Sequence, residues 1–275
     1  MFIDANETII RLSAFLSVLC LMAILEAVFP RRVRNLPRGG RWFTNLGLVV
    51  LNSMALRLLV PYAATEAALW ANKNGWGLLS LISLPMWLKV IISVFLLDML
   101  IYWQHVFMHK IPLLWRLHKV HHADRDLDVT SGLRFHPLEI VISMIYKILC
   151  VFLIGAPVIA VILFEVILNA GALFNHANLK LPLGIDRLLR RVIVTPDFHR
   201  VHHSVKQSET NSNYGFFLTV WDFIFRSYTP NPMNGHGGMT IGLIEYQSER
   251  PANLIWCLIV PFMKPKTPKS TDNEE

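Results

Sequence analysis

The chain has 275 residues, of which 53% are hydrophobic and only 16% charged, and its formal net charge is +7. Soluble domains contain about 25% charged residues, so this composition argues against an ordinary soluble protein and excludes an intrinsically disordered one. The basic residues lie beside apolar segments rather than among surface aromatic residues, so nucleic acid is not an expected partner. The three cysteines lie in apolar segments without a CxxC pair, and no disulfide framework is expected.

Three apolar segments within residues 9–104 are long enough to cross a membrane, which takes about 20 helical residues. These expected spans are Ile9–Phe29, Thr44–Ala64 and Pro85–Gln104. A further apolar run, residues 139–175, is interrupted by Gly-Ala-Pro at 155–157. As one helix it would measure about 55 Å, against a hydrocarbon core of about 30 Å. We therefore expect residues 139–175 to form a hairpin of two short helices.

The distribution of Lys and Arg predicts the orientation of these spans. Residues 31–42 hold five arginines and no acidic residue, so they are expected to be cytoplasmic. Alternating spans then place residues 105–136 and 176–262 in the cytoplasm as well, and residues 263–275 are expected to form a disordered tail. The sequence thus predicts an all-α integral membrane protein, a single domain over 1–275. It would have four to five transmembrane or re-entrant helices and a cytoplasmic helical cap rich in histidine.

Eight of the eleven histidines lie in three short boxes, and none lies in residues 1–104. The boxes are HVFMH (His105 and His109), HKVHH (His118, His121 and His122) and HRVHH (His199, His202 and His203). Residues three or four apart share one face of a helix, so each box presents two or three imidazoles together. Imidazole is a ligand for iron, zinc, copper and nickel. One zinc ion takes about three or four protein ligands, so eight or more histidines at one membrane face indicate two metal ions.

The remaining polar candidates are isolated in the sequence. His176, which follows the apolar hairpin, is expected to be a further ligand, whereas His236, in a glycine-rich stretch, is not. His136 is left open between a ligand and a structural residue. Asp98 shares a helical face with His105 and His109, so it is either an acceptor for a ligand histidine or a polar group satisfied within the bundle. The other candidate acceptors for ligand histidines are the carboxylates of Asp124, Asp126, Glu139, Asp197 and Asp222.

The order HxxxH, HxxHH and HxxHH, with an apolar hairpin before the last box, resembles the fatty acid hydroxylase/sterol desaturase superfamily of membrane histidine-box diiron oxygenases. The segments LWRLHKVHHAD, RFHPLE, TPDFHRVHHS and NYGFFLTVWDFIF are also similar to its members, most of all to bacterial members and the alkylglycerol monooxygenase branch. The resemblance covers residues 85–230. It implies a membrane lipid substrate and two iron ions that use O2. The electrons would come from a separate reductase, ferredoxin or cytochrome, because the chain has no dinucleotide-binding, haem-attachment or ferredoxin motif.

The resemblance assigns the ligands to His105, His109, His118, His121, His122, His176, His199, His202 and His203. Some members have one more histidine four residues after the position of His176. Here that position is Lys180, which leaves water or His136 to take its place. The resemblance also implies a bacterial inner membrane with the boxes on the cytoplasmic side, or the endoplasmic reticulum membrane in a eukaryote.

Hydroxylation of a fatty-acyl, alkyl-lipid or sterol-like substrate is the favoured reaction, with desaturation or oxidative demethylation on the same site as the alternative. Proteins of other classes fit less well. A zinc hydrolase would carry HExxH, which is absent. A metal transporter would place its ligands near the bilayer midplane, whereas these boxes lie at the ends of spans. A structural metal-binding membrane protein remains a further alternative.

Overall fold

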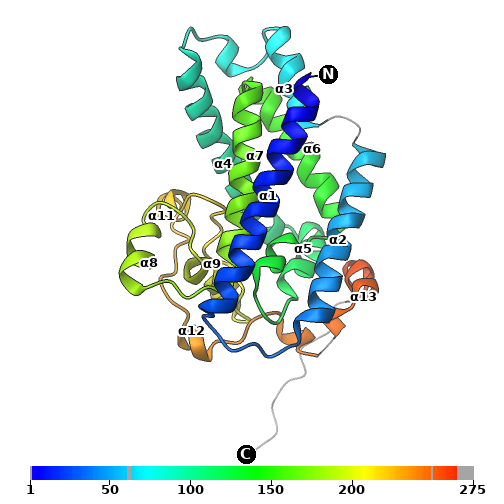
Figure 1. Ribbon diagram of the computed structural model, residues 1–275, viewed down its shortest axis with the longest axis vertical. Helices are drawn as coiled ribbons and strands as arrows, with labels where there is room; N and C mark the ends of the chain where they lie inside the picture. Colours follow the sequence, from blue (N-terminus) through cyan, green and yellow to red (C-terminus); the bar gives the residue numbers. More distant parts are fainter. Residues whose placement is uncertain (1, 61–62, 249, 265–275) are drawn as a thin grey trace, which may run out of the picture.

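The computed structural model describes residues 2–60, 63–248 and 250–264, and for residues 2–7 it describes the backbone alone. Within these ranges the regular structure is helical, and the only β-type pairings are three isolated bridges. Long helices stand side by side in the upper part of the molecule, and short helices and loops form a cap below them (Figure 1).

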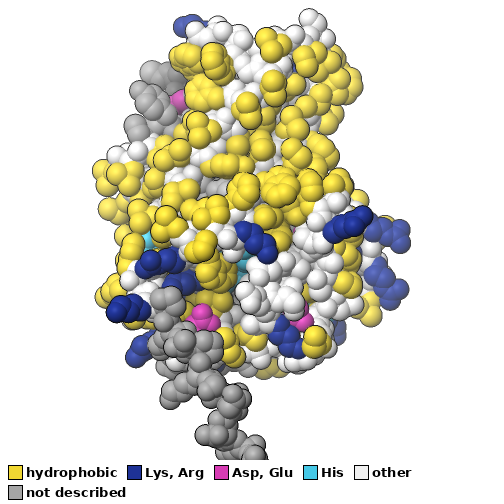
Figure 2. Space-filling model, turned by 180° about the vertical axis from the view of Figure 1, so that it is seen from behind, with side chains coloured by type: hydrophobic (Ala, Val, Ile, Leu, Met, Phe, Trp, Pro, Cys, Tyr) yellow, Lys and Arg dark blue, Asp and Glu magenta, His cyan; other side chains and the backbone are white. Residues whose placement is uncertain are grey.

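The upper part consists of α1 (Phe2–Val28), α2 (Arg38–Leu59), α4 (Met86–Lys110), α6 (Pro137–Ile154) and α7 (Val158–His176). Five described helical stretches are long and apolar enough to cross a membrane. They are Thr8–Val28, the stretch that begins with α2 at Arg38, Met86–Lys110, Pro137–Ile154 and Val158–His176. The protein is therefore an all-α membrane protein, as the sequence predicts. Hydrophobic side chains cover the upper part of the surface, and most Lys and Arg side chains on the visible face lie lower down (Figure 2).

Two of the expected spans have different limits in the structure. The second begins earlier and ends at Leu59, before α3 (Ala64–Lys73) and η1 (Leu78–Ser80), which connect it to α4 at the end far from the cap. Residues 61 and 62 of the expected span lie outside the described residues. The third span continues six residues beyond Gln104, so α4 carries the first histidine box in its last two turns.

The apolar run 139–175 is broken where the sequence predicts it. Gly155 ends α6 in the left-handed conformation, with φ of 70°, and Pro157 caps the start of α7. The turn also packs against a second glycine, because a Cβ on Gly77 would lie 2.3 Å from the Gly155 nitrogen. Helix α7 therefore runs back toward the cap, packed against α1 and α4, and brings His176 to the cap.

The cap contains α5 and the short elements after α7. Their bounds are α5 (Pro112–His122), η2 (Val129–Leu133), α8 (Leu183–Leu189), α9 (Pro196–His202), α10 (Gln207–Thr210), α11 (Val220–Ile224), α12 (Gly235–Gly238), η3 (Ile244–Tyr246), η4 (Arg250–Ala252), α13 (Leu254–Ile259) and η5 (Val260–Phe262). Leu254 and Cys257 of α13 pack on Leu48 of α2 in an apolar cluster, which joins the end of the cap to a long helix. Of the expected tail, residues 265–275 lie outside the described residues.

Candidate metal centre

Four helices carry nine histidines to one buried region. The C-terminal turns of α4 supply His105 and His109, and the last residue of α7 supplies His176. The second box lies at the end of α5. The third box lies on α9, a helix of only seven residues, with His203 directly after it. Among the described residues, these histidines form two groups whose candidate ligand atoms lie within 4.8 Å of one another. The groups are His105, His109, His118, His122 and His202, and His121, His176, His199 and His203.

The spacing of the ring nitrogens fits coordination of a metal ion. Nε2 of His176 lies 3.1 Å from Nε2 of His121 and 3.1 Å from Nε2 of His199. In the other group, Nε2 of His202 lies 3.1 Å from Nε2 of His105. Two nitrogens bound at about 2.1 Å to one metal ion are separated by roughly 3.0 Å at a right angle and 3.4 Å at a tetrahedral angle. The observed distances lie between these values.

The two groups adjoin each other. The rings of His122, from the first group, and His203, from the second, are stacked with their centroids 4.6 Å apart. The rings of His118 and His121, also one from each group, lie 5.2 Å apart. The geometry is therefore that of two neighbouring sites rather than two separate ones.

The outward-facing nitrogens of five histidines have acceptors. Because carbonyl and carboxylate oxygens accept hydrogen bonds, Nδ1 of these rings donates, which leaves the Nε2 lone pair directed at the centre. The pairs are His105 with the Tyr214 carbonyl (2.8 Å), His118 with Glu139 Oε1 (2.6 Å), His121 with the Arg134 carbonyl (3.3 Å), His176 with the Ala172 carbonyl (2.8 Å) and His202 with the Ser212 carbonyl (2.7 Å).

Several inner nitrogens lack hydrogen-bond partners although they are buried. Nε2 of His109, Nε2 of His118 and both ring nitrogens of His122 are examples. Buried polar atoms are almost always hydrogen-bonded, so a cluster of such atoms marks a place for a group that the chain itself does not supply. The donor set therefore fits metal ions, and the imidazole nitrogens suit iron.

The histidines of the cap are held in the neutral form that binds metal. Burial, reinforced by neighbouring imidazoles, lowers the pKa of His121, His122, His199 and His203 well below the usual value. Burial also lowers the pKa of His202 to about 3. No proton has to leave these rings at neutral pH before a metal ion binds.

One of the expected carboxylates contacts a ligand histidine directly, namely Glu139 through His118. Asp98 instead accepts hydrogen bonds from Trp221 Nε1 (2.7 Å) and the Leu218 amide (3.3 Å). Its proposed contact with the histidines of its own helix is therefore not observed. Asp98 fixes the segment at 218–221 against α4, and this segment follows the carbonyl of Tyr214.

Asp222 supports the same segment from the other side. It accepts from the amides of Tyr214 (2.8 Å) and Gly215 (2.7 Å) and from the Ser227 hydroxyl (2.6 Å). Burial raises the pKa of Asp222 to about 6. Asp222 thus acts on His105 indirectly, because it holds the Tyr214 backbone whose carbonyl accepts from that ring. In the sequence, Tyr214 and Gly215 belong to the NYG part of NYGFFLTVWDFIF, and Asp222 belongs to its WD part.

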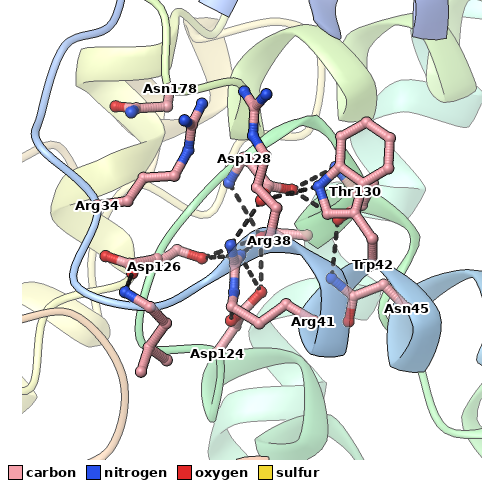
Figure 3. Close-up of polar contacts among 12 residues, drawn as sticks. Arg34, Arg38, Arg41, Trp42, Asn45, Asp124, Asp126, Asp128, Thr130 and Asn178 are labelled. Atoms are coloured by element: carbon pink, nitrogen blue, oxygen red, sulfur yellow. Dashed lines mark hydrogen bonds and ion pairs between the residues drawn. The ribbon is translucent and has the colours of Figure 1, made fainter. Parts of the chain in front are cut away.

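A buried ionic network fixes the loop after the second box to α2 (Figure 3). Arg41 donates two hydrogen bonds to Asp124 (2.7 and 2.8 Å) and one to Asp128 (2.6 Å). Asp128 in turn accepts from the amide and hydroxyl of Thr130. Burial alone would raise the pKa of Asp124, but Arg41 lowers it to about 2. From the sequence, Arg41 is one of five arginines that predict the orientation of the spans; in the structure it also positions the chain between His122 and Arg134.

The other arginines between α1 and α2 are also bonded. Arg31 pairs with Asp197 on α9 (3.0 Å), and Arg38 pairs with the buried Glu26 of α1 (3.0 Å). Asp126, another expected acceptor for histidine, instead accepts from the amides of residues 35 and 36. Asp124, Asp126 and Asp197 therefore hold the cap together, and in the described part of the chain none of them forms a hydrogen bond with the nine clustered histidines.

Two histidines lie outside both groups. Nδ1 of His136 accepts from the Leu138 amide (3.2 Å) at the start of α6, and its Nε2 faces the Leu258 carbonyl (3.3 Å). His136 therefore does not stand in for the histidine that some relatives carry at Lys180, which is exposed here. Nε2 of His236 lies 3.7 Å from Oδ2 of Asp197, and His236 belongs to neither group.

A model of the fatty acid hydroxylase family matches residues 90–227, which include all nine clustered histidines. The chain belongs to the fatty acid hydroxylase family. With this membership, and with relatives that are named hydroxylases, monooxygenases and oxidases, the protein is an oxidoreductase of lipid metabolism.

Curated relatives extend the match beyond the family segment. An ornithine lipid hydroxylase from Rhizobium tropici is 25% identical over 237 residues, which are 82% of this chain and 70% of the relative. Alkylglycerol monooxygenase from Danio rerio is 32% identical over 55% of this chain and 33% of its own length. Lathosterol oxidase from Mus musculus is 26% identical over 60% of this chain and 50% of its own length. The chain thus spans half or less of the last two relatives, and no solved structure matches it.

In this member of the fatty acid hydroxylase family, two cavities reach the histidines from different sides. The larger, about 370 Å³, lies among α1, α2, α4, α6 and α7, has a mostly apolar lining and ends at His105 and His118. The second, about 310 Å³, is lined by cap residues and reaches His109 beside Trp115. Trp115 packs on His109 with ring centroids 5.0 Å apart. The centre is thus accessible both from the long helices and from the cap.

Proposed function

We propose that the protein is an O2-dependent, non-haem diiron oxygenase that hydroxylates a C–H bond of a fatty-acyl, alkyl-lipid or sterol-like substrate. The observation that carries this proposal is the pair of adjoining imidazole groups at the end of an apolar cavity between membrane helices. The first group would hold one iron ion and the second group the other. When bound, the two ions supply O2 activation with electrons from an external donor.

The chain's own residues have three tasks in this proposal. The apolar walls of the larger cavity bind the lipid chain and exclude water from the reacting C–H bond. Glu139 and the four carbonyl acceptors hold the ring protons on Nδ1, which fixes the tautomers of five ligands. The relatives are an ornithine lipid hydroxylase, an alkylglycerol monooxygenase and a lathosterol oxidase, and they support a lipid as the class of substrate.

The proposal also places the cap in the cytoplasm, with the long helices in a bacterial inner membrane or, in a eukaryote, in the endoplasmic reticulum. The gathering of Lys and Arg on the cap side supports this orientation (Figure 2). A reductase, ferredoxin or cytochrome would deliver electrons at the cap. The second cavity supports this side for the donor, because it brings cap residues such as Gln207 and Glu245 next to His109.

Metal analysis of the purified protein after anaerobic iron loading tests the metal centre. We expect about two iron ions per chain, with a clear loss in the His121→Ala and His202→Ala variants. His236→Ala is the matched control and should keep its iron, because His236 belongs to neither group. One zinc ion per chain that iron does not displace would overturn the proposal in favour of a hydrolytic or structural site.

Product analysis under ¹⁸O2 tests the reaction. An alcohol that carries ¹⁸O supports hydroxylation. A product with a new C=C bond and no incorporated ¹⁸O would instead identify a desaturase on the same site.

A further inference from the structure

Three charged side chains line the larger cavity at a distance from the histidines. They are Arg11 of α1, Lys147 of α6 and Glu165 of α7. The Lys147 ammonium donates to Glu165 Oε1 at 2.5 Å, and Arg11 forms an ion pair with the other carboxylate oxygen. The three side chains are 29%, 12% and 6% exposed for Arg11, Lys147 and Glu165, respectively. We call them the ionic triad.

The ionic triad lies within the membrane-spanning part of the chain. Lys147 is eight residues after Glu139, the acceptor for His118, which corresponds to about 12 Å along α6. Glu165 is eleven residues before His176, or about 16 Å along α7. The cavity therefore has the histidine centre at one end and the ionic triad toward the other.

Ionisable groups at this depth are costly, and they usually face a ligand or an ion pathway. Two further side chains show that the cavity is built for a polar ligand as well as for hydrocarbon. Asn52 and Gln104 line it and are each 8% exposed. Oδ1 of Asn52 is buried without a hydrogen-bond partner, and the side-chain amide of Gln104 adds a second polar group to the lining. A purely hydrocarbon ligand would leave the Asn52 oxygen unsatisfied.

We propose that Arg11 and Lys147 bind the oxyanion of an acidic lipid, a carboxylate or a phosphate, whose chain runs along the cavity toward His105 and His118. This assignment of substrate class rests on the proposed lipid oxidation. Cations that donate several hydrogen bonds suit an oxyanion. Glu165 positions both cations through its ion pairs, and it also competes with the lipid oxyanion for their N–H groups. An extended chain advances about 1.2 Å per bond, so the oxidised carbon would lie roughly ten bonds from the acidic group.

Binding to the iron-loaded protein in nanodiscs, without O2 and without an electron donor, tests this proposal without turnover. The probes are radiolabelled hexadecanoic acid, hexadecyl phosphate and, as the uncharged reference, methyl hexadecanoate. We expect whichever of the two acids binds more tightly to bind at least about tenfold more tightly than the ester, because hydrogen bonds to charged groups are stronger than those to neutral groups. Preference for the phosphate or for the carboxylate then identifies the group.

The variants have expected effects of opposite sign. Lys147→Gln should lower the acid-to-ester affinity ratio about tenfold, and Lys147→Arg should preserve it. Glu165→Gln removes the competing carboxylate and should raise the ratio. Lys89→Gln is the matched control, because Lys89 is also on a membrane helix but does not line the cavity.

A ratio that stays at the wild-type value in both Lys147→Gln and Glu165→Gln would overturn the proposal and leave the ionic triad a purely structural contact. Because the ratio compares two probes on the same sample, partial unfolding of a variant does not imitate the effect. Failure of the iron analysis above would refute the oxygenase but leave these affinities unchanged.

Discussion

Replacement of Arg41 by methionine should destabilise the protein strongly. The guanidinium is 1% exposed and bonds Asp124, Asp128 and the Ser131 hydroxyl. Arg41→Met leaves both carboxylates buried without a cation, and loss of one partner from a buried ionic network costs about 3–5 kcal/mol. For a protein of this size, that loss corresponds to a melting temperature lower by roughly 6–20 °C.

The pH dependence of stability gives an independent estimate of the free energy that this network contributes to folding. Arg41 holds the pKa of Asp124 at about 2, against 3.8 ordinarily. A lowered pKa in the folded state means that the stabilisation is present above pH 4 and is lost as the pH falls toward 2. The lowered pKa corresponds to about 2 kcal/mol of stabilisation through Asp124 alone. Because Arg41 also pairs with Asp128, this value agrees with a loss of about 3–5 kcal/mol for the whole network.

Thermal unfolding in detergent, followed by tryptophan fluorescence between pH 2.5 and 7, measures both effects. The wild type should lose stability as the pH falls below about 6.5, because the buried histidines stay neutral in the folded protein and take up protons on unfolding, and it should lose a further increment below pH 4 through Asp124. Arg41→Met should be less stable at pH 7 and should lack the increment below pH 4. Adding Asp124→Asn and Asp128→Asn to Arg41→Met should recover much of the loss. Arg57→Met, an exposed position on the same helix, is the control. An Arg41→Met protein that melts within 2 °C of wild type would refute the reasoning.

Three further predictions concern the metal centre. Glu139→Gln, which removes the charge 2.6 Å from His118 Nδ1, should weaken metal binding about 10–100-fold in a chelator competition. Gly132→Ala places a Cβ 2.5 Å from the Ala172 carbonyl and 3.2 Å from His176 Nδ1, so it should cost about 1–3 kcal/mol and lower the iron content. Removal of metal by a chelator should lower the melting temperature, and added iron should restore it.

The two substitutions have matched controls in the chain. Glu66→Gln changes an exposed carboxylate on α3 and should leave metal affinity unchanged. Gly184→Ala adds a Cβ that meets no atom of the described residues within 4 Å. If Gly132→Ala retained full iron content, the close packing of η2 on α7 would not govern the position of His176. If chelation left the melting temperature unchanged, metal binding would not be linked to folding.

The sequence predicted the features that depend on local spacing. Imidazoles three or four residues apart share a helix face wherever the helix lies, so the HxxHH boxes could be recognised without knowledge of the fold. The Gly-Ala-Pro break in 139–175 is equally local, because the run is too long for one span and Gly155 adopts a positive φ. Both features appear in the structure at the expected residues.

Contacts between distant segments could not be predicted in the same way. In RFHPLE the sequence left His136 open between a ligand and a structural residue, and it could not rank Glu139 among five candidate carboxylates. In the structure Glu139 contacts His118, and His136 caps α6. Asp98 does lie on the helix of His105, but the indole of Trp221, 123 residues later, takes its carboxylate. Which acid meets which base depends on how α4, α6 and the cap pack, and one sequence does not contain that information. The two cavities could not be predicted either, because their walls also come from segments that are far apart in the sequence.

The order of the histidines along the chain has a consequence for biogenesis. His105 and His109 are synthesised first, but every member of the second group except His121 comes from His176 or later. A nascent chain with α1 to α4 in the membrane therefore carries only two of the nine imidazoles. Neither group is complete before the third box is made, because His202 belongs to the first group and His199 and His203 belong to the second. A chain that ends before α9 therefore lacks part of both proposed metal sites, and metal binding would stabilise only chains in which α7 and α9 have reached α5.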